Sequence, residues 1–151
     1  MNIFVSAPFS RLCLADGGFE PLSRGYFEAV ILRLKESGHS IYSAHLIENW
    51  GARLRDPKSM VIEDFAGIRT CDALVAYLGG PVSEGVFVEL GWASALEKPV
   101  ILLLEERREY SPLVANLSAL VRSYKLYIDE AGGVADILNP LVEILDHFTE
   151  N

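Results

Sequence analysis

Glu89 is the first sign of chemistry in the sequence, because it stands in an otherwise apolar stretch with helical spacing. Nearly every residue from 85 to 96 is apolar, and Val86, Trp92 and Ala93 neighbour Glu89 on a helical wheel. An unpaired carboxylate is costly to bury, and burial can raise its pKa by roughly 3 to 5 units. We therefore predict that Glu89 faces a cavity as a reacting group. Alternatively, it lies at the rim of the fold and only complements the helix dipole.

The loop before this helix has the composition of a phosphate-binding turn. Residues 79–85 read Gly-Gly-Pro-Val-Ser-Glu-Gly, between a predicted strand and the predicted helix. In such a loop the free backbone N–H groups near Gly85 and the hydroxyl of Ser83 can bind a phosphate. Glycine-rich loops are also common as simple turns, so the loop alone does not establish a ligand.

Asp64 is a second candidate acid, on the predicted helix that precedes this loop. A carboxylate there could orient a substrate hydroxyl or share a proton with the substrate. The alternative is that Asp64 is a solvated helix residue. Asp72, at the start of the next predicted strand, is interpreted as a strand-entry cap rather than a catalyst.

Strands and helices alternate along the whole chain, which predicts one α/β domain over residues 1–151. The predicted strands are continuously apolar, as in a parallel sheet covered on both faces. We expect a doubly wound, Rossmann-like or flavodoxin-like sheet of five strands. In such sheets ligands bind beyond the carboxyl ends of the strands, here the loops 6–18, 44–50 and 79–85. The predicted strands are 3–5, 40–44, 73–78, 99–104 and 125–128, and the predicted helices are 21–37, 58–70, 86–96 and 134–148.

Composition limits the partners. The formal charge of −8 and the pI near 4.8 would repel a nucleic acid. The apolar runs are too short or too interrupted to span a bilayer, so we expect no membrane contact. The first residues lack a basic region of the secretory type, and a cytoplasmic location is expected.

The cysteines and histidines do not predict a metal site. Cys13 and Cys71 have no partners at metal-ligand spacing, and His39, His45 and His147 form no cluster in the sequence. We expect no metal and no cofactor, with both cysteines reduced.

Two segments resemble the nucleoside 2-deoxyribosyltransferase family. One is residues 62–72, Ile-Glu-Asp-Phe-Ala-Gly-Ile-Arg-Thr-Cys-Asp, and the other is Ser83-x-Gly85-x-x-x-Glu89-Leu90-Gly91-x-Ala93, followed by Lys98-Pro99-Val100. The resemblance covers most of the chain. It implies that Glu89 is the nucleophile that attacks the anomeric carbon of a sugar. It also implies that Asp64 assists at the base and sugar, and that Asp72 belongs to the fold.

The residue type at Ser83 helps to decide to which branch of this family the chain is similar. The family divides into transferases that act on free deoxynucleosides and hydrolases that act on nucleoside 5'-monophosphates. In transferases an acidic residue tends to stand at this position and receives the 5'-hydroxyl, whereas this chain has serine, as the hydrolases do. A carboxylate would repel a phosphate and a hydroxyl can donate to it, so the resemblance favours the hydrolases.

The opening segment Ser6-Ala7-Pro8-Phe9-Ser10-Arg11 resembles that of cytidylate-type hydrolases of nucleoside-antibiotic pathways. Substrate contacts are therefore expected from Ser6, Pro8, Phe9 and Arg11. Phe9 can stack on a base and Arg11 can reach the base or the phosphate, although both can equally be ordinary loop residues.

Two further positions follow from the resemblance. His45 falls where the hydrolases carry a histidine near the sugar, although a lone histidine at a strand end is commonly structural. Ser118, in Leu117-Ser118-Ala119, matches a segment by which a neighbouring subunit contacts the phosphate. This implies a homodimer with a shared active site.

The resemblance thus implies hydrolysis of the N-glycosidic bond of a nucleoside 5'-monophosphate, with a pyrimidine, CMP-like substrate. The reaction would pass through a covalent glycosyl-Glu89 intermediate, as in retaining glycosidases. Two alternatives stay open. One is base exchange by a 2-deoxyribosyltransferase, and the other is a nucleotide-binding sensor without turnover.

Overall fold

The protein is described by a computed structural model that places residues 1–129 and 133–149. In this part of the chain five parallel strands form one sheet in the order β2-β1-β3-β4-β5. This is the strand order of flavodoxin-like, doubly wound folds, so the predicted fold class is confirmed. The strands are β1 (Asn2–Ser6), β2 (Ser40–Tyr42), β3 (Ala73–Tyr77), β4 (Val100–Glu105) and β5 (Ser123–Ile128).

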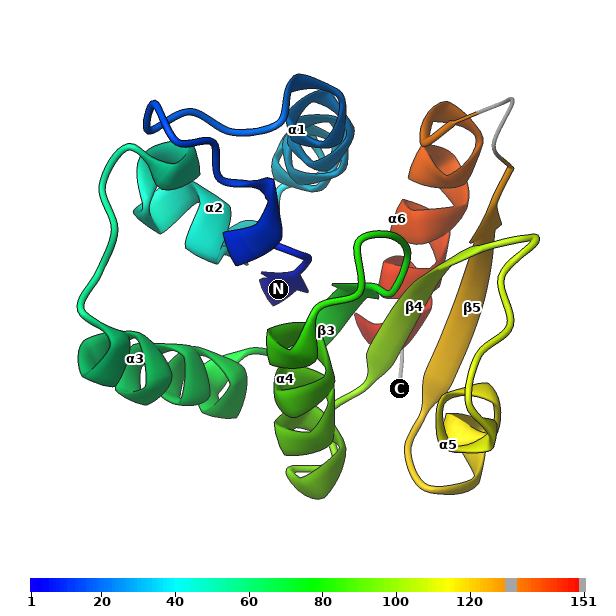
Figure 1. Cartoon of the computed structure of the whole chain (residues 1–151). Coiled ribbons are helices and arrows are strands. Elements are labelled where there is room, and N and C mark those ends of the chain that lie inside the picture. The colour runs from blue at the N-terminus through cyan, green and yellow to red at the C-terminus, as the bar shows by residue number, and fades with distance from the viewer. Residues whose placement is uncertain (130–132, 150–151) are drawn as a thin grey trace.

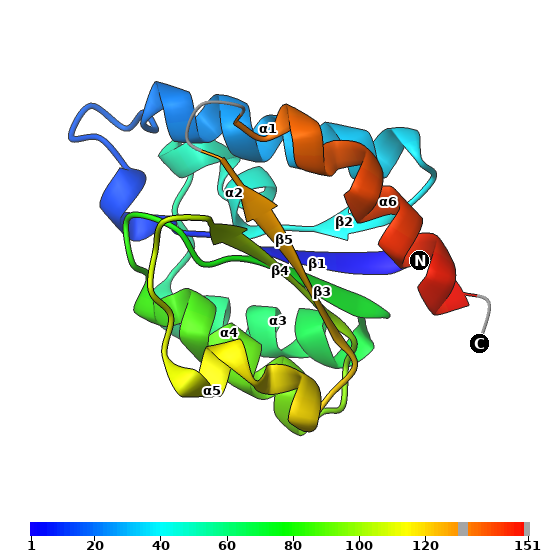
Figure 2. The same ribbon diagram turned by 90° about the vertical axis from the view of Figure 1, so that its right-hand side faces the viewer.

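Helices cover both faces of the sheet. They are α1 (Pro21–Glu36), α2 (Ala44–Ile47), α3 (Pro57–Thr70), α4 (Glu84–Ala95), α5 (Pro112–Ala115) and α6 (Ala135–Thr149), with 3₁₀ turns η1 (Ser10–Leu12), η2 (Asn49–Gly51) and η3 (Leu117–Ala119). Figures 1 and 2 show α1 and α6 on one face and α3, α4 and α5 on the other.

Because both faces are covered, neighbouring residues of one strand enter two different cores. Ile3 and Val5 of β1 pack with α1 and α6, whereas Phe4 packs with α3 and α4. In β4, Ile101 likewise packs in the first of these cores and Leu102 in the second. This arrangement requires the unbroken apolar strands that the sequence shows.

The second strand is shorter than predicted. β2 ends at Tyr42, and the chain then turns into α2, so the prediction of a strand over residues 40–44 is wrong at its end. The turn brings the buried side chain of His45 among the rings of Phe9, Phe27 and Trp50, at centroid distances of 5.2 Å from each. Burial of this aromatic cluster competes with extension of an edge strand.

Side-chain caps define the starts of the two helices that carry the candidate acids. Asp56 accepts hydrogen bonds from the backbone N–H groups of Lys58 and Ser59 at 3.1 and 2.9 Å, and Pro57 occupies the first turn of α3. The Ser83 Oγ accepts from the Val86 N–H at 3.4 Å and caps α4. The positions of Asp64 and Glu89 along their helices follow from these caps.

Asp72 joins the beginnings of two central strands. Its Oδ2 accepts a hydrogen bond from the backbone N–H of Asn2 at 2.6 Å, and its own N–H donates to the Asn2 carbonyl at 2.8 Å. Asp72 therefore supports the sheet at the end opposite to the loops after β1 and β3.

Gly67 of α3 lies close to the sheet, and Gly25 of α1, which lies in open space, serves as its comparison. A Cβ at Gly67 of α3 would lie 3.2 Å from ring carbons of Phe4 and Tyr42, whereas a Cβ at Gly25 of α1 would meet nothing within 4 Å. We expect Gly67→Ala to lower the free energy of unfolding by about 1–3 kcal/mol through overpacking. Gly25→Ala should raise it by about 0.5–1 kcal/mol through helix propensity. Urea denaturation measures both, and a stabilising Gly67→Ala would contradict this packing.

Candidate active site

A cavity of about 140 Å³ opens beyond the carboxyl end of β1, next to the point where the strand order reverses between β1 and β3. This is the place where open α/β sheets bind their ligands. Its walls come from the end of β1, the loop after it, α2, α3 and α4. The lining residues are Phe4, Val5, Ser6, Ala7, Phe9, Ser10, Ala44, His45, Glu48, Met60, Asp64, Ser83, Gly85, Val86 and Glu89.

Glu89 lies on the wall of this cavity, partly buried, in the second turn of α4. The Ser6 hydroxyl donates a hydrogen bond to its Oε2. Burial raises the pKa of Glu89 to about 7; the bond from Ser6 opposes this shift and the negative charge of Asp64 adds to it. Near neutral pH the carboxyl can therefore serve in its ionised or its protonated form.

Asp64 is buried, not solvated, and it lines the same cavity. Both of its oxygens are engaged by Arg55, with Nη1 to Oδ1 at 3.0 Å and Nη2 to Oδ2 at 3.3 Å. The Tyr42 hydroxyl also donates to Oδ1, at 2.9 Å. Because a bidentate arginine and a phenol hold it, the Asp64 carboxylate has a fixed orientation toward the cavity.

Glu48 is a third acidic residue of the cavity, and sequence reasoning missed it. Its side chain is 3% exposed, and its Oε1 accepts from Arg55 Nε at 3.0 Å. Glu48 lies within the loop 44–50 that was expected at the site, so its location gave a signal. Arg55 and Tyr42 gave none, because neither stands in a recognisable motif.

His45 reaches the cavity but is occupied by structural contacts. Its Nε2 lies 3.0 Å from the Pro8 carbonyl and its Nδ1 lies 3.3 Å from Ser43 Oγ. A carbonyl only accepts, so Nε2 carries the hydrogen and Nδ1 accepts from Ser43. Burial lowers the pKa of His45 to about 4, opposed by the bond to Pro8, so the ring is neutral at pH 7. His45 thus anchors the Pro8-Phe9 turn beside the cavity.

A smaller hollow of about 130 Å³ adjoins the cavity at the beginning of α4. It shares Phe9, Ser10, Ser83 and Gly85 with the cavity and adds Arg11. This hollow combines a cation, hydroxyl groups and the amino end of a helix, which are features that bind an anion, and the exposed Glu84 also lies on its wall. Pro8 and Arg11 line this hollow and not the cavity.

Ser118 lies apart from the other candidates. It is exposed on η3, which precedes β5, and it lines neither the cavity nor the adjoining hollow. Within one chain the structure therefore brings together the predicted residues except Ser118.

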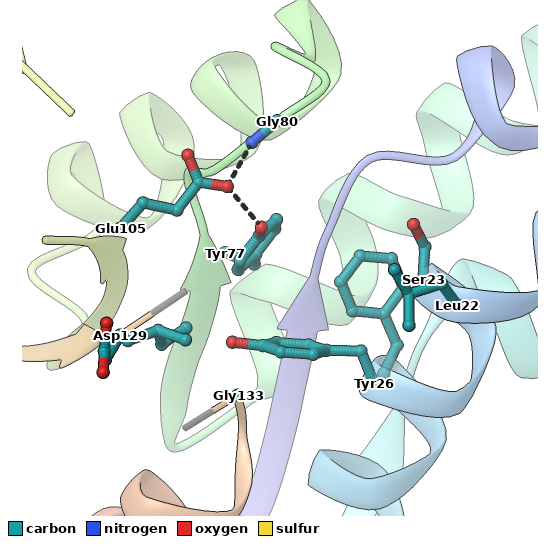
Figure 3. Close-up of a pocket in the computed structure, with 10 residues that line it drawn as sticks. Leu22, Ser23, Tyr26, Tyr77, Gly80, Glu105, Asp129 and Gly133 are labelled. Carbon is teal, nitrogen blue, oxygen red and sulfur yellow. Dashed lines mark hydrogen bonds between the residues drawn. The ribbon is translucent and has the colours of Figure 1, made fainter. Parts of the chain in front are cut away.

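A larger cavity, of about 330 Å³, lies beyond the carboxyl ends of β3, β4 and β5 (Figure 3). There the Glu105 carboxylate accepts from the Tyr77 hydroxyl and from the Gly80 N–H, both at 2.8 Å. A Cβ at Gly79 would lie 2.2 Å from the Tyr77 hydroxyl and 2.4 Å from Glu105 Oε1, so a side chain at this position would displace these two groups. Glu105 thus fixes the beginning of the loop that carries Ser83, and its carboxylate is committed to that task.

Two kinds of site are absent from the part of the chain that the structure describes. Within residues 1–129 and 133–149, no group of three or more His, Cys, Asp or Glu side chains can hold a metal ion. None of the helices placed by the structure combines the length and apolar character needed to cross a bilayer.

The raised pKa of Glu89 predicts a pH-dependent stability. The pKa rises from an ordinary 4.5 to about 7 on folding, so between these values the folded state binds the proton more tightly than the unfolded chain. As pH rises through this window, the wild type should lose about 3 kcal/mol of unfolding free energy relative to Glu89→Gln. Denaturant titrations of both proteins at several pH values measure this difference. Parallel pH curves would show that Glu89 is not held with a raised pKa.

Comparison with known proteins agrees with this geometry. A sequence model of the nucleoside 2-deoxyribosyltransferase family matches residues 13–139. No match to the chain was found among curated proteins.

Several solved structures are similar to this chain. The Clostridium botulinum CMP N-glycosidase BcmB has 26% sequence identity and a TM-score of 0.74, with 95% of this chain and 99% of that chain covered. BlsM has 31% identity and a TM-score of 0.75, with 91% and 85% covered. A 2-deoxyribosyltransferase from Bacillus psychrosaccharolyticus has the same fold at 19% identity, with a TM-score of 0.59 and 93% and 90% covered. Since the family match spans most of the chain and includes Asp64, Ser83 and Glu89, this protein belongs to the nucleoside 2-deoxyribosyltransferase family.

Proposed function

We propose that the protein hydrolyses the N-glycosidic bond of a pyrimidine nucleoside 5'-monophosphate, CMP-like in character, to the free base and (deoxy)ribose 5-phosphate. The observation that carries this proposal is the partly buried Glu89 carboxyl, which lies in one cavity with Asp64 and beside the Ser83 anion hollow. The similarity to BcmB, a CMP N-glycosidase, supports it.

The proposed reaction has two steps on one carboxyl group. The ionised Glu89 attacks C1' of the sugar, the bond from C1' to the base nitrogen breaks, and its electron pair leaves with the base, which takes up a proton. Water then attacks C1' of the resulting ester, and the carboxylate is released with sugar 5-phosphate as the second product. Two displacements replace one difficult step, as in retaining glycosidases.

The neighbours of Glu89 suit these steps. Ser6 donates to the carboxylate and holds it in place. Asp64, buried and fixed, can accept hydrogen bonds from a sugar hydroxyl or assist proton delivery to the leaving base. Phe9 lines the cavity, where its ring can stack on a base.

Ser83 supports a phosphorylated substrate. Its Oγ accepts from the Val86 N–H at 3.4 Å, which leaves the hydroxyl hydrogen free to donate to a phosphate oxygen. Arg11 lines the same hollow and adds a positive charge. A base-exchange enzyme that takes free nucleosides has no use for such an anion site, so this hollow favours the hydrolase over the transferase.

The proposal includes a homodimer in which Ser118 completes the phosphate site of a second copy. A groove of about 590 Å³ between α4 and α5 is lined mostly by apolar side chains. Leu113 and Leu120 on this face are 85% and 71% exposed, and Phe87 is 41% exposed. Exposed apolar patches of this kind mark protein contacts, and the exposed Ser118 lies in the chain between Leu117 and Leu120, which both line the groove.

A panel of nucleoside 5'-monophosphates and matching nucleosides, assayed by chromatography for released base, tests the reaction. We expect cleavage of the monophosphates in preference to the nucleosides. Glu89→Gln should reduce turnover by at least about 10⁴-fold, since nucleophile removal costs roughly that or more. Ser83→Asp keeps a helix cap but repels phosphate, so it should lower the preference for monophosphates.

Ser23→Asp, which adds the same charge in the first turn of α1, is the control and should leave that preference unchanged. Equal or better cleavage of unphosphorylated nucleosides by the wild type would overturn the phosphate site. Formation of a new nucleoside in the presence of a foreign base would establish exchange instead. Tight nucleotide binding without base release, unaffected by Glu89→Gln, would establish a sensor.

Light scattering tests the dimer. The wild type should have about twice the chain mass of 16.7 kDa. Leu113→Asp places a charge on the apolar face and should give a monomer with weakened monophosphate cleavage. Leu22→Asp is a matched control, because Leu22 is 81% exposed on α1, outside that groove. A monomeric wild type with full activity would contradict the shared site.

A further inference from the structure

The Arg55 side chain is the common partner of several acidic groups around the cavity, although it does not line the cavity itself. It lies before α3 and is 11% exposed. Its Nε donates to Glu48 Oε1 at 3.0 Å, and its two Nη atoms donate to the two oxygens of Asp64 at 3.0 and 3.3 Å. Its Nη1 also contacts the Tyr42 hydroxyl at 3.2 Å and Glu63 Oε2 at 3.1 Å.

These contacts differ in what they contribute. The Glu63 side chain is 52% exposed, so its ion pair with Arg55 is screened by water. The Glu48 and Asp64 side chains are 3% and 9% exposed, and each would be a buried charge without Arg55. The guanidinium therefore serves mainly the two carboxylates that face the cavity.

We propose that Arg55 is a positioning residue for the glycosidic cleavage: its planar guanidinium holds the carboxyl groups of Asp64 and Glu48 turned into the cavity and joins them into one rigid wall. This inference rests on the proposed function. A fork of donors in one plane can meet both Asp64 oxygens and Glu48 at once, whereas a lysine ammonium is a point charge that cannot reproduce this geometry.

Arg55 also belongs to the electrostatic surroundings of Glu89. Ser6 on β1, Asp64 on α3 and Arg55 itself shift the pKa of Glu89, and the neutral His45 on α2 and Glu48 line the same cavity. The charge of Asp64 raises the pKa of Glu89 and that of Arg55 lowers it. Loss of the guanidinium charge therefore disfavours the ionised form of the nucleophile.

Two substitutions separate geometry from charge. Arg55→Lys keeps the charge and loses the fork, so kcat should fall by up to about 100-fold, as expected for a misplaced catalytic group, while KM changes little. The acidic limb of the pH profile of kcat/KM should stay near that of the wild type. Arg55→Gln loses fork and charge together, so it should show the same loss of kcat and an acidic limb moved to higher pH.

Arg53→Lys and Arg53→Gln are the controls. Arg53 lies two residues away and is exposed, and it lines neither the cavity nor the adjoining hollow. Both changes should leave kcat and the pH profile unchanged. If Arg55→Gln does not fold, Arg55→Lys still tests whether the geometry of the guanidinium positions Asp64 and Glu48.

An activity-independent measurement keeps this inference separate from the proposed function. NMR titration of the Glu89 carboxyl carbon should show a higher pKa in Arg55→Gln than in the wild type or in Arg55→Lys. An active wild type with unchanged kcat in Arg55→Lys would overturn the positioning role, as would equal Glu89 titration in all three proteins. A wild type that releases no base would overturn the proposed function, with the NMR result still bearing on Arg55.

Discussion

The structure depends on one costly placement, a carboxyl group on an apolar helix at the edge of a parallel sheet. The fold compensates it with one hydroxyl, from Ser6, and with the cavity that Glu89 faces, while burial leaves its pKa near 7. The ionised form of Glu89 is less stable than that of a surface glutamate, so ionisation of Glu89 does not stabilise the fold. Such a balance is typical of reacting groups.

The topology explains why the partners of Glu89 come from distant parts of the chain. β1 and β3 are neighbours in the sheet, and the connections that follow them lead to helices on opposite faces of the sheet. Ser6 therefore meets Glu89 across 83 residues, and Asp64 faces the same cavity from α3. Glu105, at the end of β4, supports the site from behind by fixing Gly80, which leads the chain into Ser83 and α4.

Much of this arrangement could be predicted from the sequence, because the strong signals are local. Buried parallel strands need continuous apolar residues, and a lone acid in an apolar helix needs a cavity. The segment after β2 gave no such pattern: Asn49 and Trp50 adopt positive φ angles of 45° and 53° in a turn that only the aromatic cluster explains. Arg55 escaped prediction since its role consists entirely of contacts with side chains from β2, the α2 region and α3.

The central claim is that Glu89 forms a bond to the anomeric carbon of a nucleotide. Mass spectrometry after incubation with a 2'-fluorinated nucleoside 5'-monophosphate tests it directly, because the fluorine slows hydrolysis of a glycosyl ester formed through an oxocarbenium-like transition state. The account predicts a sugar phosphate adduct on the peptide that contains Glu89, and none in Glu89→Gln. Release of the base at a normal rate with no adduct, or an adduct on another residue, would contradict it.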